Sequence, residues 1–399
     1  MAVLLFGAAR ADALGWSAQP SPTTLPLYGV SFSTPSTWVA VGDGGTILQS
    51  TDGGIGWATV PSPVGDALRA VSFLGNVGVA VGIAGRVVRS TDAGASWVQE
   101  PRPTTKALYS VSMGANTAVI TGEEGRIFFS TDAGLTWAAR FAGTASVLFG
   151  VSVNGSTAVG VGGAGAVVMS TNGGDAWGLT IIGTPLTFFY GTSFASPSTG
   201  WLVGTSDVVP SIIARSTSGG FTWTAQTSPT AEGLFGVSFP SLDVGTAVGT
   251  NGAIIHTADG GQHWNVQPSG VTQTLNAVSF ADLALGIAVG DGGTILRTTT
   301  GGSTGVDEGS ALRSVAALEC SANPFRASTT LRFTTRSAGA VSLKVFNVLG
   351  EEVATLASGD LAPGTRAATW DASGLPAGTY FARLLAQGID ETRKLTLVR

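Results

Sequence analysis

The sequence predicts an all-β protein: a seven-bladed β-propeller closed by its N-terminal strand, followed by a small immunoglobulin-like β-sandwich. Three observations lead to this expectation. A tryptophan recurs about every 40 residues, each recurrence ends a Gly-rich turn, and four short apolar runs fill every interval. Repeats of this length with four strands each are typical of propeller blades. Helical repeats are disfavoured, because 58 glycines would be costly in helices and no unit has a 3.6-residue apolar period.

The tryptophan series also predicts how the ring closes. A step of 41 residues beyond the last repeat reaches Gly305, where the tryptophan is missing, and a step of 41 back from Trp57 reaches Trp16. We therefore expect the seventh blade to take its outermost strand from residues 14–19, which would remove two free sheet edges. The seven repeat tryptophans are Trp16, Trp57, Trp97, Trp137, Trp177, Trp223 and Trp264.

Each of the last six tryptophans ends an eight-residue box, for example STDGGIGW at 50–57 and STDAGASW at 90–97. An Asp in such a turn accepts hydrogen bonds from backbone N–H groups of its own turn, and a following Gly permits a positive φ. The tryptophan would then begin the outer strand and pack against a neighbouring strand or blade. We expect a structural role for the acids at this position, which are Asp52, Asp92, Asp132 and Asp259.

These boxes resemble the Asp-box, or bacterial-neuraminidase repeat. The wider unit resembles the Asp-box propellers of the photosystem II assembly factor type, over about residues 14–305. The resemblance implies a propeller whose boxes lie on hairpins away from the binding face. It implies protein binding for the assembly factors and glycoside hydrolysis for the sialidases that share the box.

One residue begins the inner strand of every blade, and together these residues would surround the mouth of the central channel. An aromatic-rich ring there would suit a peptide or a glycan, although packing between blades would also explain it. The residues of this mouth ring are Tyr28, Arg69, Tyr109, Phe149, Tyr190, Phe235 and Asn276. Blade 5 departs from the template by four extra residues in the turn at 205–213 and one more near Phe188, so we expect function near this blade.

The sequence predicts no catalytic residue, no metal site and no cofactor. Charged residues make up 11% of the chain and histidines number 2. Sialidases need three arginines for the substrate carboxylate, and here the inner strands offer only Arg69. His256 and His263 fall in the blade template, on the hairpin between the third and fourth strands. A sialidase-like glycoside hydrolase with an unrecognised site remains the alternative to a binding protein.

The tryptophan pattern stops after Gly305, and residues 306–317 have the composition of a linker. Residues 318–399 carry 9 basic and 7 acidic side chains, a net charge of +2, whereas residues 1–317 carry 11 and 18, a net charge of −7. Alternating strands separated by Gly, Pro and Asp turns predict a small antiparallel β-sandwich for residues 318–399.

This second segment resembles the C-terminal sorting domain of proteins exported by the type IX secretion system. The ordered motifs are NPF at 323–325, VFNVLGEEVATL at 345–356, WD at 370–371 and GTY at 378–380, followed by a basic end. The residues that carry the resemblance are Asn323, Pro324, Phe325, Gly350, Trp370, Gly378, Tyr380 and Lys394. The resemblance implies secretion machinery as a partner of residues 318–399. An ordinary accessory β-sandwich is the alternative.

Residues 1–13 are expected to be a signal-peptide remnant, because AVLLFGAA at 2–9 precedes an A-x-A-like site. Eight apolar residues are too few for a transmembrane helix, which needs about 20. The net charge of −7 over residues 1–317 makes nucleic acid an unfavourable partner. The sequence therefore predicts a monomeric binding propeller that is secreted or displayed at the outer-membrane surface, via the periplasm, and recognises a protein or glycan ligand.

Overall fold

The computed structural model describes residues 15–115, 117–302, 318–320, 323–335, 339–348, 351–362, 364–386 and 389–398. The chain divides into two compact units, Met1–Glu308 and Gly309–Arg399, and each is described by itself. Every regular element of the described residues is a strand or a three-residue 3-10 turn. The expected signal-peptide remnant at 1–13, the linker at 306–317 and Gly350 lie outside the described residues.

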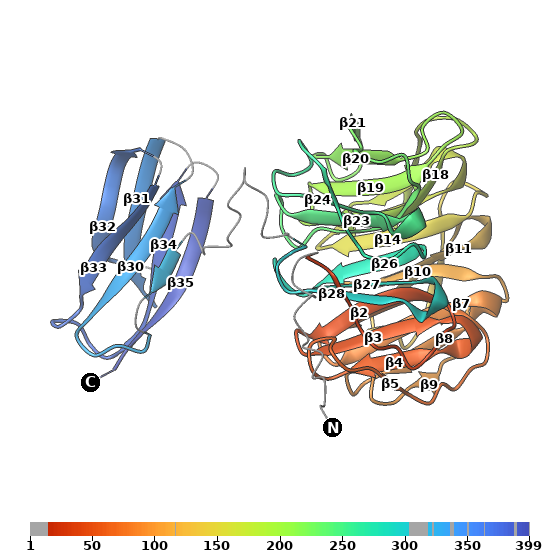
Figure 1. Ribbon diagram of the computed structural model, residues 1–399, viewed down its shortest axis with the longest axis horizontal. Coiled ribbons are helices and arrows are strands. Elements are labelled where there is room, and N and C mark those ends of the chain that lie inside the picture. The colour runs from red at the N-terminus through yellow and green to blue at the C-terminus, as the bar shows by residue number, and fades with distance from the viewer. Residues whose placement is uncertain are drawn as a thin grey trace, which may run out of the picture. The chain divides into compact units, whose positions relative to one another are not determined.

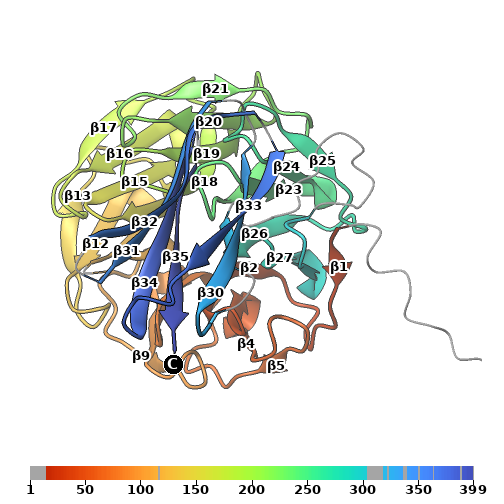
Figure 2. The ribbon, with the colours of Figure 1, turned by 90° about the vertical axis from the view of Figure 1, so that its left-hand side faces the viewer.

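The first unit holds seven four-stranded antiparallel sheets, which Figure 2 shows arranged around a common axis. Sheet 1 consists of β2 (Leu27–Thr34), β3 (Thr37–Gly42), β4 (Ile47–Ser50) and β5 (Ala58–Thr59). Sheet 2 consists of β6 (Leu68–Leu74), β7 (Val77–Gly82), β8 (Val87–Ser90) and β9 (Val98–Gln99). Sheet 3 consists of β10 (Leu108–Met113), β11 (Ala118–Gly122), β12 (Arg126–Ser130) and β13 (Ala138–Phe141). Sheet 4 consists of β14 (Leu148–Asn154), β15 (Thr157–Gly162), β16 (Ala166–Ser170) and β17 (Gly178–Ile181).

The remaining sheets follow the same order (Figure 1). Sheet 5 lacks the 3-10 turn between its second and third strands, and sheet 7 takes its outer strand from the N-terminal side of the unit. Sheet 5 consists of β18 (Phe188–Phe194), β19 (Gly200–Thr205), β20 (Ile212–Ser216) and β21 (Thr224–Gln226). Sheet 6 consists of β22 (Leu234–Ser238), β23 (Gly245–Gly249), β24 (Ile254–Thr257) and β25 (Asn265–Gln267). Sheet 7 consists of β26 (Leu275–Phe280), β27 (Gly286–Gly290), β28 (Ile295–Thr298) and β1 (Ser17–Ala18). The 3-10 turns between the second and third strands are η1 (Asp43–Gly45), η2 (Ile83–Gly85), η3 (Glu123–Gly125), η4 (Gly163–Gly165), η5 (Thr250–Gly252) and η6 (Asp291–Gly293).

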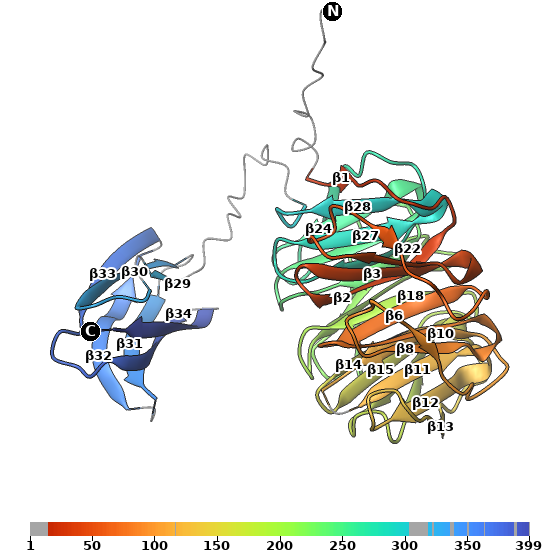
Figure 3. The ribbon, with the colours of Figure 1, turned by 90° about the horizontal axis from the view of Figure 1, so that it is seen from below.

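Sheet 7 is completed by a strand from the other end of the unit, and Figure 3 shows β1 beside β28. Ser17 pairs with Arg297 and Ala18 with Leu296. Trp16, just before β1, is 1% exposed, and its Nε1 donates to Gln267 Oε1 at 2.9 Å. A Cβ on Gly302 would lie 2.6 Å from that nitrogen, so the seventh box packs directly against this indole.

The indole of Trp16 makes the same kind of contact as the other repeat tryptophans. Its ring meets Phe280 edge-on at 5.9 Å. The corresponding pair in sheet 2, Phe73 and Trp97, is edge-on at 5.8 Å. Trp97 is buried in a cluster that includes Val39 of sheet 1, so each of these rings joins neighbouring sheets.

The box acids hold their own turns closed. Asp132 Oδ1 accepts hydrogen bonds from Ser130 Oγ at 2.7 Å and from the N–H of Thr136 at 2.9 Å. Burial raises the pKa of this carboxyl, but hydrogen bonds led by the Thr136 hydroxyl outweigh it and bring the pKa to about 2. Asn172 takes the same place in sheet 4, where its Oδ1 accepts from the N–H of Ala176 at 2.9 Å. A neutral acceptor therefore makes the same turn contact as the carboxylates.

In several sheets, a side chain of the third strand donates a hydrogen bond to a carbonyl in the box of the next sheet. Gln49 Nε2 donates to the carbonyl of Ala93 at 2.9 Å, and Arg89 Nε donates to that of Ala133 at 3.0 Å. Arg297 Nε reaches the carbonyl of Gly53 at 2.7 Å and so joins sheet 7 to sheet 1. The equivalent His256 lies within β24, not in the hairpin expected from the sequence, and its Nδ1 is 3.1 Å from Thr246 Oγ1.

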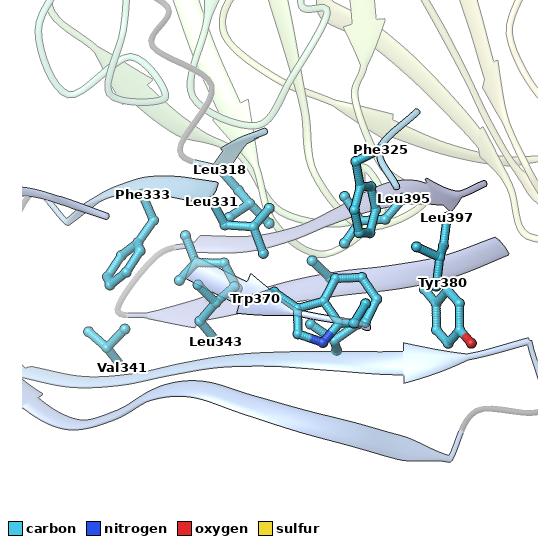
Figure 4. Close-up of a cluster of buried hydrophobic side chains, with 14 residues drawn as sticks. Leu318, Phe325, Leu331, Phe333, Val341, Leu343, Trp370, Tyr380, Leu395 and Leu397 are labelled. Carbon is cyan, nitrogen blue, oxygen red and sulfur yellow. The ribbon is translucent and has the colours of Figure 1, made fainter. Parts of the chain in front are cut away.

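The second unit has two sheets that share one core (Figure 4). One sheet has the order β29 (Leu318–Cys320), β30 (Ser328–Thr335), β33 (Gly364–Asp371). The other has the order β32 (Glu352–Leu361), β31 (Gly339–Asn347), β34 (Gly378–Ala386), β35 (Ile389–Leu397). Trp370 lies between Phe325 at 5.4 Å and Tyr380 at 5.2 Å, measured between ring centroids. These three residues of the expected sorting motif therefore build the core of the unit.

The other motif residues of this unit have more exposed positions. Asn323 Nδ2 donates to the carbonyl of Lys394 at 2.7 Å, and its Oδ1 accepts from the N–H of Thr396 at 2.8 Å. Pro324 follows in the same segment, and Gly378 begins β34. Asn323 thus fastens the segment before β30 to the last strand.

Removal of the closing strand should destabilise the whole ring. We expect deletion of residues 1–20 to lower the thermal midpoint by about 10 °C or more, because Trp16 and the β1 pairing are lost and two sheet edges open. Circular dichroism melts of the full chain and the variant measure this. Deletion of residues 1–14, which keeps Trp16 and β1, is the matched control. Equal midpoints for the two truncations would refute closure by this strand.

Acid should weaken the boxes. The pKa values of Asp52, Asp92, Asp132 and Asp259 are lowered in the folded state from the ordinary 3.8, that of Asp132 to about 2. The carboxylates therefore stabilise the fold fully above about pH 4 and lose this contribution as the pH falls toward 2. A variant with Asn at all four positions should lose less of its urea midpoint between about pH 6 and pH 2.5 than the parent chain. An identical loss in both chains would contradict this assignment.

Candidate functional site

The seven inner strands converge so closely that one position in each must be small. This position is occupied by Gly29, Ala70, Ser110, Gly150, Gly191, Gly236 and Ala277. A Cβ on Gly150 would lie 2.7 Å from the carbonyl oxygen of Tyr190, and one on Gly191 would lie 2.7 Å from that of Phe235. Backbone-to-backbone packing between neighbouring sheets therefore fixes the inner wall of the ring.

The residue before each small position lines a pocket of about 380 Å³ at the start of the inner strands. All seven residues of the mouth ring lie in its wall, and all are half-buried. The structure thus brings the whole predicted set together. The sequence analysis missed a second layer beneath it, formed by Val30, Val71, Val111, Val151, Thr192, Val237 and Val278. The recurrent Val of the inner-strand block was the signal that could have revealed this layer.

One half of the mouth ring is aromatic. Consecutive ring centroids are 5.3 Å apart for Tyr109 and Phe149, 5.2 Å for Phe149 and Tyr190, and 5.0 Å for Tyr190 and Phe235. We call these four residues the aromatic arc. Phe188 extends the arc in sheet 5, where it stacks on Tyr190 at 6.5 Å. The arc packs sheet against sheet, as one explanation from the sequence requires, and it also lines the pocket; ligand binding by the arc stays a prediction.

The other half of the mouth ring is polar. The guanidinium of Arg69 lies over the ring of Tyr28, 4.1 Å from its centroid. Asn276 Nδ2 donates to the carbonyl of Leu27 and to Asp291 Oδ1, both at 3.0 Å. The amide of Asn276 is therefore used within the protein, whereas the Nε of Arg69 is buried with no hydrogen-bond partner.

Electrostatics around the pocket are set by few groups. Burial raises the pKa of Tyr109, the negative charge of Glu123 adds to the rise, and the positive charge of Arg69 partly opposes it. Glu123 itself accepts a hydrogen bond from the N–H of Ala107 at 3.2 Å. Arg69 is the only charged residue among those that line the pocket.

The pocket does not offer the groups that hydrolysis of a glycosidic bond needs. Such enzymes place two carboxyl groups around the scissile bond, and no Asp or Glu lines this pocket. His263 Nδ1 is 2.6 Å from Asp259 Oδ2 in a box, at the other end of the strands. Over the part of the chain that the structure describes, no group of three or more His, Cys, Asp or Glu could hold a metal ion.

Blade 5 lacks the 3-10 turn of the other six sheets. Its loop at 206–211 leaves Val208 72% exposed and Val209 48% exposed. The preceding connection contacts this loop, since Thr184 Oγ1 donates to Asp207 Oδ1 at 3.2 Å, and it carries Leu186, which is 54% exposed. An apolar surface therefore lies on the mouth side of sheet 5.

Comparison with known families decides the classification of the chain. The model of the family described as photosynthesis system II assembly factor YCF48 matches residues 8–159 and 216–307, which is more than half of the chain. The chain belongs to the YCF48 family. A second model, the secretion system C-terminal sorting domain, matches residues 323–398. Both resemblances seen in the sequence are thus confirmed.

Solved structures agree on the propeller fold of this YCF48-family chain. A structure titled YCF48 bound to D1 peptide has 24% identity and a TM-score of 0.60, and the match covers 74% of this chain and 100% of that one. YCF48 from Cyanidioschyzon merolae has 20% identity and a TM-score of 0.58, covering 71% and 98%. The WD40 propeller domain of Doa1 has 10% identity and a TM-score of 0.58, covering 71% and 96%. At these identities the likeness shows the fold alone.

Two further findings complete the comparison. No curated protein matches the chain significantly. Among the described residues, no helix is long and apolar enough to cross a membrane.

The close approach of the inner strands can be tested with a pair of glycines. We expect Gly191→Ala to cost about 1–3 kcal/mol of unfolding free energy, because its Cβ would collide with the backbone of β22. Gly178→Ala on the outer strand β17 is the matched control, since its Cβ would meet nothing within 4 Å, and it should be neutral or slightly stabilising. Urea denaturation of both variants gives the difference, and equal effects would argue against a crowded axis.

Proposed function

We propose that this chain is a secreted or outer-membrane-surface binding protein: a seven-bladed propeller, closed by its N-terminal strand, that binds a peptide at its channel mouth. In this proposal residues 318–399, as an immunoglobulin-like sorting sandwich, direct export, and the protein acts as a monomer. The observation that carries the binding role is the pocket itself, which has an aromatic arc on one side and one unpaired cation on the other.

The comparisons support the proposal at two points, binding and export. The chain shares its family and fold with a YCF48 that was solved with a D1 peptide, so this fold can hold a peptide. The sorting domain match supports export through a secretion machinery. We do not extend the photosystem role to this chain, because its sorting domain supports export from the cell, whereas a photosystem assembly factor acts at a photosynthetic membrane.

The character of the pocket favours a peptide over a glycan. Sugars require many hydrogen-bonding groups placed around their hydroxyls, whereas apolar pockets with a few polar groups suit apolar side chains and backbone. In this pocket the amide of Asn276 is already used, and the layer beneath the mouth ring is mostly valine. The exposed Val208 and Val209 beside sheet 5 extend the apolar surface.

Substitutions in the aromatic arc test the proposal. Arrays of short peptides and of glycans, probed with the full chain, should yield peptide ligands. Tyr190→Ala and Tyr109→Ala should each weaken such a ligand about tenfold or more, because buried aromatic contacts dominate binding energies of this kind. Titration by isothermal calorimetry gives the dissociation constants.

Phe141→Ala is the matched control for these two variants. Phe141 is also aromatic, but it is 81% exposed at the end of the outer strand β13 and does not line the pocket. Its replacement should leave binding unchanged. Peptide binding that survives both tyrosine substitutions would remove the mouth from the proposal, and an array that yields only glycans would exclude a peptide ligand.

A further inference from the structure

The one charge in the pocket wall has no partner within the protein. Three other arginines of the first unit have carboxylate partners: Arg86 with Asp66, Arg126 with Glu124 and Arg140 with Asp175. Arg215 resembles Arg69 in having a buried, unpaired Nε, but it does not line the pocket. Among the described residues Arg69 has neither a carboxylate partner nor a hydrogen-bond acceptor, and its Nε is buried. No carboxylate of the protein neutralises this guanidinium, so a ligand that brings an anion to the pocket wall gains a charge-assisted contact.

Stacking on Tyr28 prepares this guanidinium for a planar anion. The guanidinium carbon lies 4.1 Å from the centroid of the Tyr28 ring, which supports the charged group from one side. The N–H donors of a guanidinium form a fork that matches the two oxygens of a carboxylate. Lys, a point charge, would lack both the stacking face and the fork.

The nearby acidic side chains form no ion pair with the guanidinium of Arg69. Glu123 is engaged by the N–H of Ala107, and Asp291 is engaged by the side chain of Asn276. Neither of them lines the pocket, so its wall carries a single positive charge. The charge of the pocket therefore complements an anion.

The position of Arg69 in the mouth ring gives the ligand a direction. In chain order Arg69 lies between Tyr28 and Tyr109, and Tyr109 begins the aromatic arc. A group held by Arg69 thus has apolar contact surface on the side of sheets 3 to 6, and this surface includes Phe188 and the exposed valines of sheet 5.

We propose that the mouth recognises a carboxylate of the bound peptide through Arg69, with an apolar side chain of the same peptide resting on the aromatic arc. This inference rests on the proposed function and adds the chemical class of the ligand. The carboxylate has two sources in a peptide, its C-terminus or an Asp or Glu side chain, and the experiment separates them.

Two pairs of synthetic peptides serve as probes of the full chain. The first pair is GSGLF with a free C-terminus and GSGLF amide. The second pair is GELFG amide and GQLFG amide. We expect the acidic member of one pair to bind about tenfold more tightly than its neutral partner, as for a charge-assisted bidentate contact. Preference in the first pair identifies a C-terminal carboxylate, and preference in the second identifies a side chain.

Arg69 variants test whether this residue reads the charge. In Arg69→Gln the ratio of the dissociation constants of the neutral and acidic peptides should fall to about one. Arg69→Lys should retain part of the preference for the acidic peptide. Arg86→Gln, in the same sheet but paired with Asp66 and outside the pocket wall, is the control and should keep the full ratio. Thermal midpoints of all variants check that they fold.

The outcomes distinguish this inference from the proposed function. Equal binding of acidic and neutral peptides by the parent chain, or a preference that persists in Arg69→Gln, overturns the carboxylate assignment but leaves peptide binding intact. The comparison within the parent chain does so even if Arg69→Gln fails to fold. No binding of any peptide, in the probes or on the array, overturns the proposed function together with this inference.

Discussion

The pairing of β1 with β28 is the interaction on which the first unit depends. Ser17 Oγ donates to the carbonyl of Arg297, 280 residues away in the sequence, so the pairing joins the two ends of the unit. Without it, sheet 7 would lose its outermost strand and the buried Trp16. The loss would spread, because the buried clusters lie between sheets: one contains Val39 of sheet 1 together with Trp97 of sheet 2, and another contains Leu27 of sheet 1 together with Ile287 of sheet 7. A closed ring makes each sheet part of its neighbours' cores.

Closure also determines what kind of site the unit can carry. Seven inner strands meeting at an axis restrict one position in each of them to Gly, Ala or Ser, and at Gly150 and Gly191 a Cβ would lie 2.7 Å from a backbone oxygen of the next sheet. One residue earlier, the side chain lines the pocket and is only half-buried, and here the chain places Tyr, Arg, Phe and Asn. Side chains at this earlier position therefore differ from sheet to sheet within one chain while the backbone of the ring repeats. In this chain the position holds the aromatic arc and Arg69.

Local patterns explain how much of this could be predicted from the sequence. The box and its tryptophan lie within eight consecutive residues, so the propeller class and the strand order could be predicted. Because the repeats align, the residue that begins each inner strand could also be named. Side-chain contacts between different repeats could not be predicted from the sequence. The third-strand position of Gln49, Arg89 and Arg297 has no common chemistry in sequence, yet these side chains share one role, because each reaches a box carbonyl of the next sheet. The stacking of Arg69 on Tyr28 depends in the same way on the distance between neighbouring sheets.

Ring closure and the pocket lie at opposite ends of the strands. Residue Leu27 pairs with Gly42 next to η1, so the mouth lies at the end of the strands that carries the 3-10 turns. Trp16 and Gly302 meet at the opposite end, among the boxes. The contacts that close the ring and the residues that line the pocket therefore lie at opposite ends of the strands. Trp16 and Gly302 are absent from the pocket wall, so ring closure and the pocket use separate sets of residues.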